Sequence, residues 1–249
     1  VFNRYQIDWI DNDNFLVNDL AEHIINQGQS CLVILNTITD TKSLYDELLA
    51  RLTDIQIILI NTHFIPEDRI KKIETAKNLL ESEKQIILIS TQLIEAGVDI
   101  DFPIVYRDLC PLPSLVQSAG RCNRNKKIDK GQVYFFQLQK MQGKPSSEII
   151  YKKEAAEFLK FSKKEIQNGI EEKDLFKIQS KFFDFIRDNL TIGDFDYGFN
   201  QHSNMIECIN KAQFEILGKF QLINKDIFGE QYRYYIPKDD NDDTYDQLV

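Results

Sequence analysis

Short apolar runs alternate with amphipathic stretches along the first 140 residues of the chain. Continuous apolar runs of this length are typical of strands buried on both faces of a sheet, and we expect such strands at 31–35, 55–60, 86–89 and 104–106. Helical spacing predicts helices at 15–27, 40–52 and 66–80. An edge strand at 3–8 and a closing strand at 132–138 complete the pattern. The alternation predicts an α/β fold, a parallel sheet with helices on both faces.

The remainder of the chain has a different pattern, and a polar, breaker-rich link over 141–147 separates the two parts. We therefore expect one domain over 1–140 and a second region over 141–249. The second region reads as mostly helical, at 148–168 and 171–189, with phenylalanines at helical spacing as core candidates. A short strand pair (219–223 with 232–236) and an acidic tail (238–243) are expected near its end.

Polar chemistry gathers between Gln85 and Gly131. The run from Ile86 to Ile89 ends in Ser90-Thr91-Gln92, and ligands of α/β proteins collect at the carboxyl ends of such strands. Gly97 then supplies a backbone that tolerates a positive φ. These features predict that Asp99 lies at the tip of a loop between two buried strands.

A helix is predicted after Pro111 and Pro113, with Ser114 as its cap or in its first turn. Continued helical spacing places Gln117, Arg121 and Arg124 on one face, opposite an apolar face made of Leu115, Val116, Ala119 and Cys122. Because no acid occurs between positions 108 and 129, these guanidinium groups have no partner nearby in the sequence. Such groups suit phosphate oxygens, although a solvated helix face is the simpler interpretation.

Composition limits the classes of function. A net charge of −9 disfavours a general nucleic-acid coat protein, although residues 121–130 carry five basic side chains against one acidic one. The four cysteines lack C-x-x-C spacing, so neither a disulfide framework nor a zinc site is indicated, and no metal is assigned to the three histidines. No apolar run reaches membrane-spanning length. We expect a cytoplasmic protein without a membrane partner, and the initial Val1 indicates a piece of a longer polypeptide.

Two of these stretches together resemble a known family. Residues 90–99 are similar to motif V of superfamily-two helicases, and residues 117–124 are similar to their motif VI, Q-x-x-G-R-x-x-R. Asn123 before the last arginine resembles the CRISPR-associated helicase/nuclease of type I systems, as do the stretches 3–5, 35–37 and 62–69. The resemblance implies a RecA-like fold for residues 1–140 and the second motor domain of a DNA helicase acting in antiviral defence.

The resemblance also implies roles for individual residues. Arg124 would be the arginine finger, with Arg121 and Gln117 as its phosphate and water neighbours. Gly97 and Asp99 would meet the ribose side of ATP. Contacts to the backbone of single-stranded DNA would come from Asn36, Thr37 and Thr91. A CRISPR interference complex would be the larger partner.

What the sequence lacks narrows the expectation further. It contains neither a Walker A sequence nor a D-E-x-[DH] motif, so ATP and Mg²⁺ would need a first RecA-like domain, and a nuclease metal would need an HD domain. The chain alone is therefore expected to be inactive. Alternatives are an RNA helicase, a restriction translocase, or a partner-binding module without catalysis. A Rossmann-type enzyme is disfavoured because no G-x-G-x-x-G follows a strand.

Overall fold

The structure is a computed structural model that describes residues 3–95, 97–151, 154–189 and 210–212. Internal contacts divide the chain into two compact units, Val1–Phe185 and Ile186–Val249. The predicted link at 141–147 lies within the first unit. The strand pair and the acidic tail predicted near the end of the chain lie outside the described residues.

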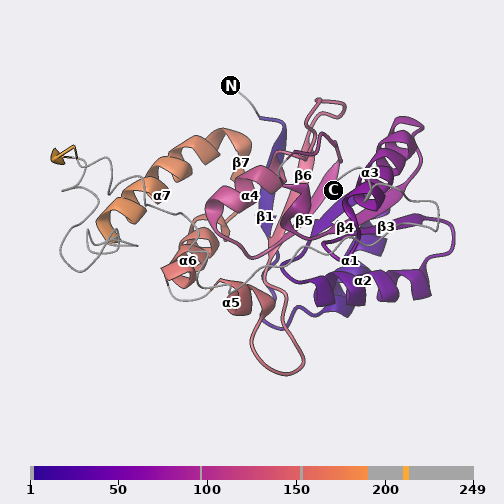
Figure 1. Ribbon diagram of the computed structural model, residues 1–249, viewed down its shortest axis with the longest axis horizontal. Coiled ribbons are helices and arrows are strands. Elements are labelled where there is room, and N and C mark those ends of the chain that lie inside the picture. Colours follow the sequence, from indigo (N-terminus) through magenta and orange to yellow (C-terminus); the bar gives the residue numbers. More distant parts are fainter. Residues whose placement is uncertain (1–2, 96, 152–153, 190–209, 213–249) are drawn as a thin grey trace, which may run out of the picture. The chain divides into compact units, whose positions relative to one another are not determined.

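One seven-stranded sheet organises the first unit, in the order β3-β4-β2-β5-β6-β1-β7 (Figure 1). Its strands are β1 Tyr5–Trp9, β2 Cys31–Ile34, β3 Gln56–Ile60, β4 Ile86–Ser90, β5 Ile104–Asp108, β6 Gly131–Phe136 and β7 Ile170–Glu171. All neighbouring strands pair in parallel except β7, which pairs antiparallel with β1. The predicted α/β fold with a parallel sheet is therefore confirmed.

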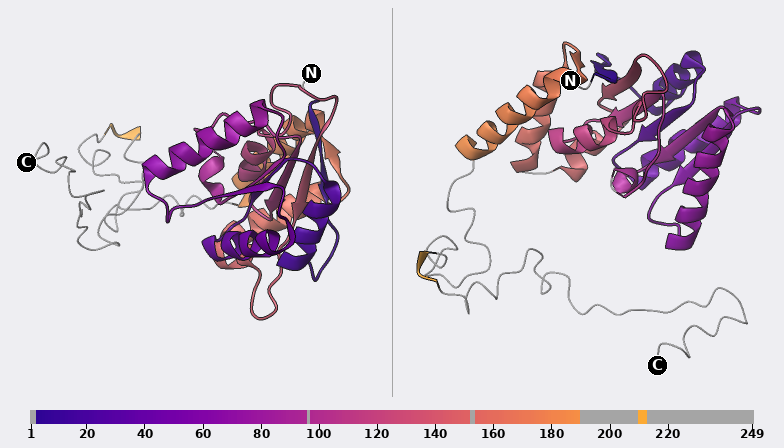
Figure 2. Two further views of the ribbon diagram at one scale, coloured as in Figure 1. Left: turned by 90° about the vertical axis from the view of Figure 1, so that its right-hand side faces the viewer. Right: turned by 90° about the horizontal axis from the view of Figure 1, so that it is seen from above.

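Helices cover both faces of the sheet (Figures 1 and 2). They are α1 Val17–Gln27, α2 Ile38–Arg51, α3 Pro66–Glu81, α4 Leu112–Ala119, α5 Ser146–Ile150, α6 Glu154–Ile166 and α7 Leu175–Asn189, with 3-10 turns η1 Gln92–Ile94 and η2 Glu172–Asp174. On one face, α1 and α2 pack over Cys31, Val33 and Ile89. The opposite face contacts α3 and α4. Among the described helices, none is both long enough and apolar enough to cross a membrane.

Local capping explains where two of the helices begin. We predicted that α1 starts after Asn14, but it starts at Val17, where the Asp19 carboxylate accepts from the Leu16 amide at 2.8 Å. Helix α2 starts at Ile38, two residues earlier than predicted, because the Thr37 hydroxyl accepts from the Asp40 amide at 3.1 Å. Thr37 is thus the cap of α2.

The sheet edge differs from the prediction. Residues 3–8 were expected to form an edge strand, but β1 lies between β6 and β7. The outer strand β7 has only two residues and comes from the region after the predicted link. A two-residue strand carries too little sequence pattern to be recognised. Its pairing extends the sheet beyond residue 140.

The helices after the sheet bury only some of the predicted phenylalanines. Phe182 is 3% exposed, and its ring lies 5.5 Å from that of Phe158 and 5.3 Å from that of Phe161. Phe176 and Phe183 were also predicted to be core residues, but they are 80% and 63% exposed. These two lie seven residues apart on one face of α7, opposite the face that packs. That part of the core prediction is wrong.

Candidate nucleotide half-site

The segment after β4 returns the chain from the carboxyl edge of the sheet to its amino edge. It begins with the turn η1 and reaches Gly97. The φ of Gly97 is +74°, a positive value that glycine tolerates, as predicted. An added Cβ at Gly97 would meet no atom within 4 Å, so the conformation rather than crowding requires glycine there. Asp99 follows with a side chain that is 73% exposed, and the segment ends at Phe102, just before β5.

Helix α4 ends earlier than predicted. We expected Arg121 and Arg124 on the same helical face as Gln117, but α4 ends at Ala119, and only Gln117 lies on it, exposed to solvent. The chain then turns and pairs with Phe102: the Phe102 amide donates to the Arg121 carbonyl at 3.0 Å, and the Asn123 amide donates to the Phe102 carbonyl at 2.9 Å. This long-range pairing replaces the helical hydrogen bonds that local spacing suggested.

Arg121 lies partly buried against the segment that follows β4. Its Nη2 donates to the Glu95 carbonyl at 2.6 Å. Its Nε is buried and has no hydrogen-bond partner among the described residues. Burial, together with the nearby charge of Arg124, lowers the pKa of Arg121. A buried guanidinium with an unused N–H is a site where an anion would be stabilised.

Arg124 pairs with Asp99, which sequence reasoning placed on a separate loop. The Arg124 Nε lies 2.8 Å from Asp99 Oδ1, with side chains 41% and 73% exposed. The Asp101 carboxylate holds the turn that carries Arg124, because it accepts from the amides of Arg124 at 2.7 Å and Asn125 at 3.1 Å. The partners of these arginines come from residues 95–101, which are distant in the sequence and not local to the arginines.

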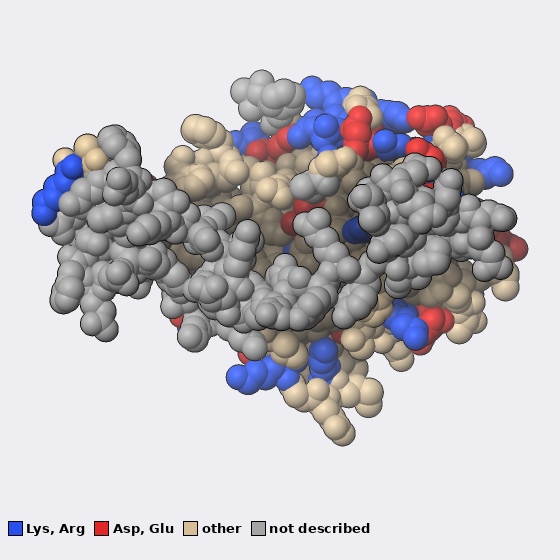
Figure 3. Space-filling view, viewed as in Figure 1, with Lys and Arg blue, Asp and Glu red and all other residues tan. Residues whose placement is uncertain are grey.

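Charge on this edge is mixed. In Figure 3 the upper edge, where the parallel strands begin, carries Lys and Arg side chains interspersed with Asp and Glu. Within the basic run at 121–130, Arg124 pairs with Asp99, and Asp101 accepts from the amides of Arg124 and Asn125, so acidic groups interrupt the positive charge. An extended nucleic-acid track would need a more uniform basic surface. This mixture of basic and acidic side chains suits a small anionic ligand better than it suits an extended nucleic acid.

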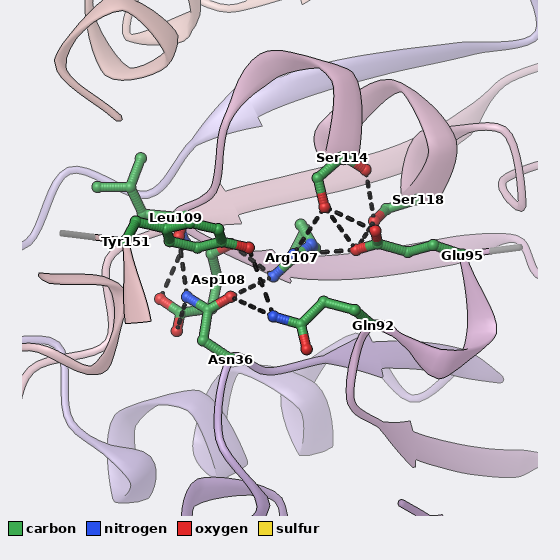
Figure 4. A network of polar contacts seen from close by, with 9 residues as sticks. All are labelled: Asn36, Gln92, Glu95, Arg107, Asp108, Leu109, Ser114, Ser118 and Tyr151. Atoms are coloured by element: carbon green, nitrogen blue, oxygen red, sulfur yellow. Dashed lines mark hydrogen bonds and ion pairs between the residues drawn. The ribbon is translucent and has the colours of Figure 1, made fainter. Parts of the chain in front are cut away.

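A buried polar network that sequence reasoning missed supports the half-site from inside (Figure 4). Arg107 on β5 is fully buried, and its Nη2 lies 2.9 Å from Glu95 Oε1. Glu95 also accepts from the hydroxyls of Ser114, at 2.7 Å, and Ser118, at 3.1 Å. The charged pair Arg107-Asp108 inside an otherwise apolar strand was the available sequence signal. Burial raises the pKa of Asp108 to about 7.

The residues predicted to touch DNA lie at the opposite, carboxyl edge. Asn36 is 4% exposed, and its amide group is occupied: Nδ2 donates to Asp108 Oδ2 at 2.7 Å, while Oδ1 accepts from Arg107 Nη1 at 2.8 Å. The Thr37 hydroxyl is engaged in capping α2. Thr91, just after β4, is 7% exposed. These side chains offer little free hydrogen-bonding surface.

A cavity of about 530 Å³ opens near this carboxyl edge. It lies between the ends of β5 and β6 and the helices α5 and α6. Its lining includes Tyr151 and three lysines, Lys144, Lys160 and Lys163. The Tyr151 hydroxyl accepts from Gln92 Nε2 at 3.4 Å, which connects the cavity to the segment after β4. In the described part of the chain, no three His, Cys, Asp or Glu side chains form a group that could hold a metal ion.

Fold and site together define a class of protein. The parallel sheet, at one edge of which the motif V-like and motif VI-like segments meet, has a RecA-like fold. Its fold is similar to that of the crystal structure of T. fusca Cas3, with a TM-score of 0.62 at 17% identity, covering 88% of this chain and 26% of that chain. A chain in a CRISPR RNA-guided surveillance complex, pre-nicking, gives a TM-score of 0.56 at 17% identity, over 88% of this chain and 28% of that one.

Sequence comparison then gives the family. Residues 27–127 match the family model described as CRISPR-associated nuclease/helicase Cas3, C-terminal. The CRISPR-associated nuclease/helicase Cas3 of Haloferax volcanii is 48% identical over 88 residues, which are 34% of this chain and 9% of that protein. Its counterpart in Streptococcus thermophilus is 31% identical over 113 residues, 43% of this chain and 12% of that protein. Residues 27–127 of this chain are therefore similar to the C-terminal part of Cas3 proteins.

The similarity covers a small part of each relative. A third relative, from Methanothermobacter thermautotrophicus, is 29% identical over 120 residues, which are 47% of this chain and 14% of that protein. The matched region thus spans between 9% and 14% of the three curated relatives. The family-model match at 27–127 contains both sequence motifs and the half-site that they form.

Proposed function

We propose that this chain is the C-terminal motor half of an ATP-dependent superfamily-two helicase or translocase that acts on single-stranded DNA in CRISPR antiviral defence. One observation carries the proposal. Backbone pairing of Phe102 with Arg121 and Asn123 brings the arginines of one motif against the Gly97–Asp99 segment of the other. Two sequence stretches that resemble nucleotide-contacting motifs therefore form one surface.

The residues of this surface fit the phosphates of ATP. Arg121 has a buried Nε without a partner among the described residues, and the Arg124 side chain pairs with the exposed carboxylate of Asp99. In the proposal, Arg124 is the arginine finger, Arg121 and Gln117 lie beside it, and Gly97 and Asp99 face the ribose. Bound ATP would supply the phosphoryl group, and these guanidinium groups would stabilise the charge that spreads over its oxygens.

This half-site cannot complete the chemistry alone. Phosphoryl transfer depends on a phosphate cradle and on Mg²⁺, and the sequence has no Walker A loop. We assign the cradle and the magnesium ligands to a first RecA-like domain of the same protein, and the nuclease metal to an HD domain. A CRISPR interference complex is the proposed recruiting partner, and the cytoplasm is the proposed location.

For the DNA track, the geometry favours a modified version of the sequence prediction. The side chains of Asn36 and Thr37 are occupied by internal hydrogen bonds and Thr91 is buried, so we assign the DNA contacts at these positions to their backbone groups. The lysines of the 530 Å³ cavity supply positive charge at the same edge, and Tyr151 supplies an aromatic ring. Cationic side chains with an aromatic ring are the usual means of holding a single strand.

The exposed aromatic residues of α7 favour a second candidate function. Phe176 and Phe183 present an apolar stripe on one helix face. Such a stripe is a typical docking surface for another protein, so the chain could serve as a binding module. Replacing both by Ser separates the two candidates: ATP hydrolysis would persist in a motor, whereas capture of the partner complex would be lost in a module.

The test of the motor proposal is DNA-stimulated ATP hydrolysis by the protein that joins this chain to a Walker A domain. Stimulated hydrolysis that depends on Arg124 supports the proposal. Stimulated hydrolysis that is indifferent to Arg124 overturns it.

A further inference from the structure

Arg107 is a positive charge placed where the sheet would accept an apolar residue. It follows Ile104, Val105 and Tyr106 on β5, all buried, and it is itself fully buried. Its Nε has no hydrogen-bond partner among the described residues. Moving two charges out of water is costly, and apolar replacements of such pairs are often equally stable or more stable. Stability alone therefore does not account for Arg107 at this position.

Glu95 links Arg107 to the half-site. Its carboxylate is held by Arg107 at 2.9 Å and by the two serine hydroxyls of α4. Its main-chain carbonyl accepts from Arg121 Nη2 at 2.6 Å. One residue thus contacts two arginines, one through its side chain and one through its backbone. Fixing the side chain of Glu95 fixes the carbonyl that orients Arg121.

The same guanidinium reaches the carboxyl edge of the sheet. Arg107 Nη1 donates to Asn36 Oδ1 at 2.8 Å and to the Asp108 carbonyl at 2.9 Å. Gln92 Nε2 lies 3.5 Å from the same Asn36 oxygen. Figure 4 shows Arg107 between Asn36 and Glu95, with one end of its guanidinium directed at each. A planar fork can make both contacts at once, which a lysine ammonium cannot.

We infer that Arg107 and Glu95 are a positioning pair that holds the Glu95 carbonyl, and through it the Arg121 guanidinium, in the geometry that a nucleotide phosphate requires. The inference rests on the proposed function, because it assigns Arg121 to a phosphate. Neither Arg107 nor Glu95 touches the nucleotide through its side chain. They contribute by fixing the position of the Arg121 guanidinium. A displacement of about 1 Å in such a group can lower the rate about 10²-fold.

The experiment separates positioning from folding. The double variant Arg107→Met/Glu95→Gln removes both members of the ion pair, so neither is left buried without the other. The buried Asp108, whose pKa is about 7, can take up a proton when Arg107 is gone, so the variant should unfold near the wild-type temperature. In the full protein we expect its kcat for DNA-stimulated ATP hydrolysis to fall about 10²-fold while KM for ATP changes little. The ion pair Lys181–Glu165, with a 2.7 Å separation on α6 and α7, provides the matched control, and Lys181→Met/Glu165→Gln should keep wild-type kcat.

Hydrogen exchange gives a readout without nucleotide. In the double variant, amides over 92–102 should exchange about tenfold faster, because Glu95 is no longer fixed by its side chain, while residues 56–60 of β3 stay protected. If the double variant fails to fold, Arg107→Lys is scored by the same measurements. Wild-type kcat together with wild-type exchange at 92–102 would overturn the inference. If Arg124→Ala also leaves DNA-stimulated ATP hydrolysis unchanged, the motor proposal itself has failed. If Arg124→Ala lowers hydrolysis and the double variant does not, only the assignment of the positioning pair is wrong.

Discussion

Arg124 and Asp99 form an exposed ion pair with 2.8 Å between Nε and Oδ1, although the sequence assigned them to opposite ends of a nucleotide. Exposed pairs contribute about 0.2–1 kcal/mol, so a phosphate can displace the carboxylate at little cost. In the proposed function, the pair therefore keeps the Arg124 guanidinium close to the site of the ATP phosphates. Several substitutions distinguish this arrangement from a surface contact without function.

Arg124→Ala is expected to lower DNA-stimulated ATP hydrolysis by about 10³-fold or more in the full protein, since an arginine that stabilises charge on a transferring phosphoryl group contributes in that range. Arg124→Lys should not restore the rate, because a point ammonium lacks the planar fork. Steady-state ATPase assays at saturating DNA measure both variants. Lys127→Ala, on the same exposed turn, is the control and should retain wild-type turnover; an equal loss there would mean that the turn is misassigned.

Asp99→Ala tests the ribose side of the half-site. Because the side chain is 73% exposed, we expect the free energy of unfolding to change by less than about 1 kcal/mol. KM for ATP should rise, with a smaller effect on kcat, since the lost contact is made in both the ground state and the transition state. Urea titration measures the free energy of unfolding, and initial-rate kinetics measure KM and kcat for ATP. An unchanged KM would remove Asp99 from the nucleotide surface.

Purified chain 1–249 should hydrolyse ATP no faster than a buffer blank, with or without DNA. Positioning and metal clamping supply nearly all phosphoryl-transfer catalysis, and this sequence carries no phosphate cradle. Phosphate-release assays at micromolar protein are sufficient for the measurement. Robust turnover that survives further purification would contradict the half-site assignment.

Binding of single-stranded DNA should be weak and moderately salt-dependent. If three lysines of the carboxyl-edge cavity each neutralise one phosphate, the slope of log K against log salt should be about −2, from roughly 0.7 per phosphate. Fluorescence anisotropy on Lys144→Ala/Lys160→Ala/Lys163→Ala should give a slope close to zero. Lys126→Ala/Lys127→Ala at the amino edge is the matched control. A steep slope that only the control variant reduces would move the track to residues 121–130.

Asp108 predicts a pH dependence of stability with a defined sign. Its folded pKa is raised to about 7 by burial, above the unfolded value of about 3.9, so the native state holds a proton that the unfolded state has released. The stabilising contribution of this group is therefore complete below about pH 4 and is lost as pH rises through about 7, at up to 1.4 kcal/mol per pH unit.

Urea denaturation across this pH range measures the effect. Asp108→Asn should flatten the dependence relative to the wild-type protein, and the exposed Asp129→Asn should leave it as it is. Identical pH profiles for the wild-type protein and Asp108→Asn would show that another group is responsible.

The sheet and most of its helices were predictable because each central strand is a continuous apolar run with its own boundaries. The region around Arg121 was not, because the local spacing of 117, 121 and 124 is fully helical while the real conformation depends on pairing with Phe102, nineteen residues earlier in the chain than Arg121. Periodicity detects local hydrogen bonds and misses such long-range ones. Arg124 nevertheless reaches Asp99, and Arg121 reaches the Glu95 carbonyl, so these contacts did not depend on the helix.

The supporting network was harder to predict for a different reason. Its members are single residues that follow β2, follow β4, or lie on β5 and α4, and nothing in their individual spacing connects them. Arg107 and Asp108 inside an apolar strand were visible as an anomaly, because charged residues are almost never fully buried without partners. The identity of those partners, Glu95 and Asn36, follows only from the order of strands in the sheet.

The backbone pairing at Phe102 has a mechanical consequence. Its amide and carbonyl bond to residues on either side of Cys122, so the segment at 97–99 and the turn that carries Arg124, which we propose to face the ribose and the phosphates, are tied together at this point. The packing of Gly131 reinforces this, since a Cβ there would come within 2.5 Å of Cys122 Sγ. If the domain rotates relative to a neighbour, both segments move together, so in the proposed function the contacts to the ribose and to the phosphates would form and break at the same time.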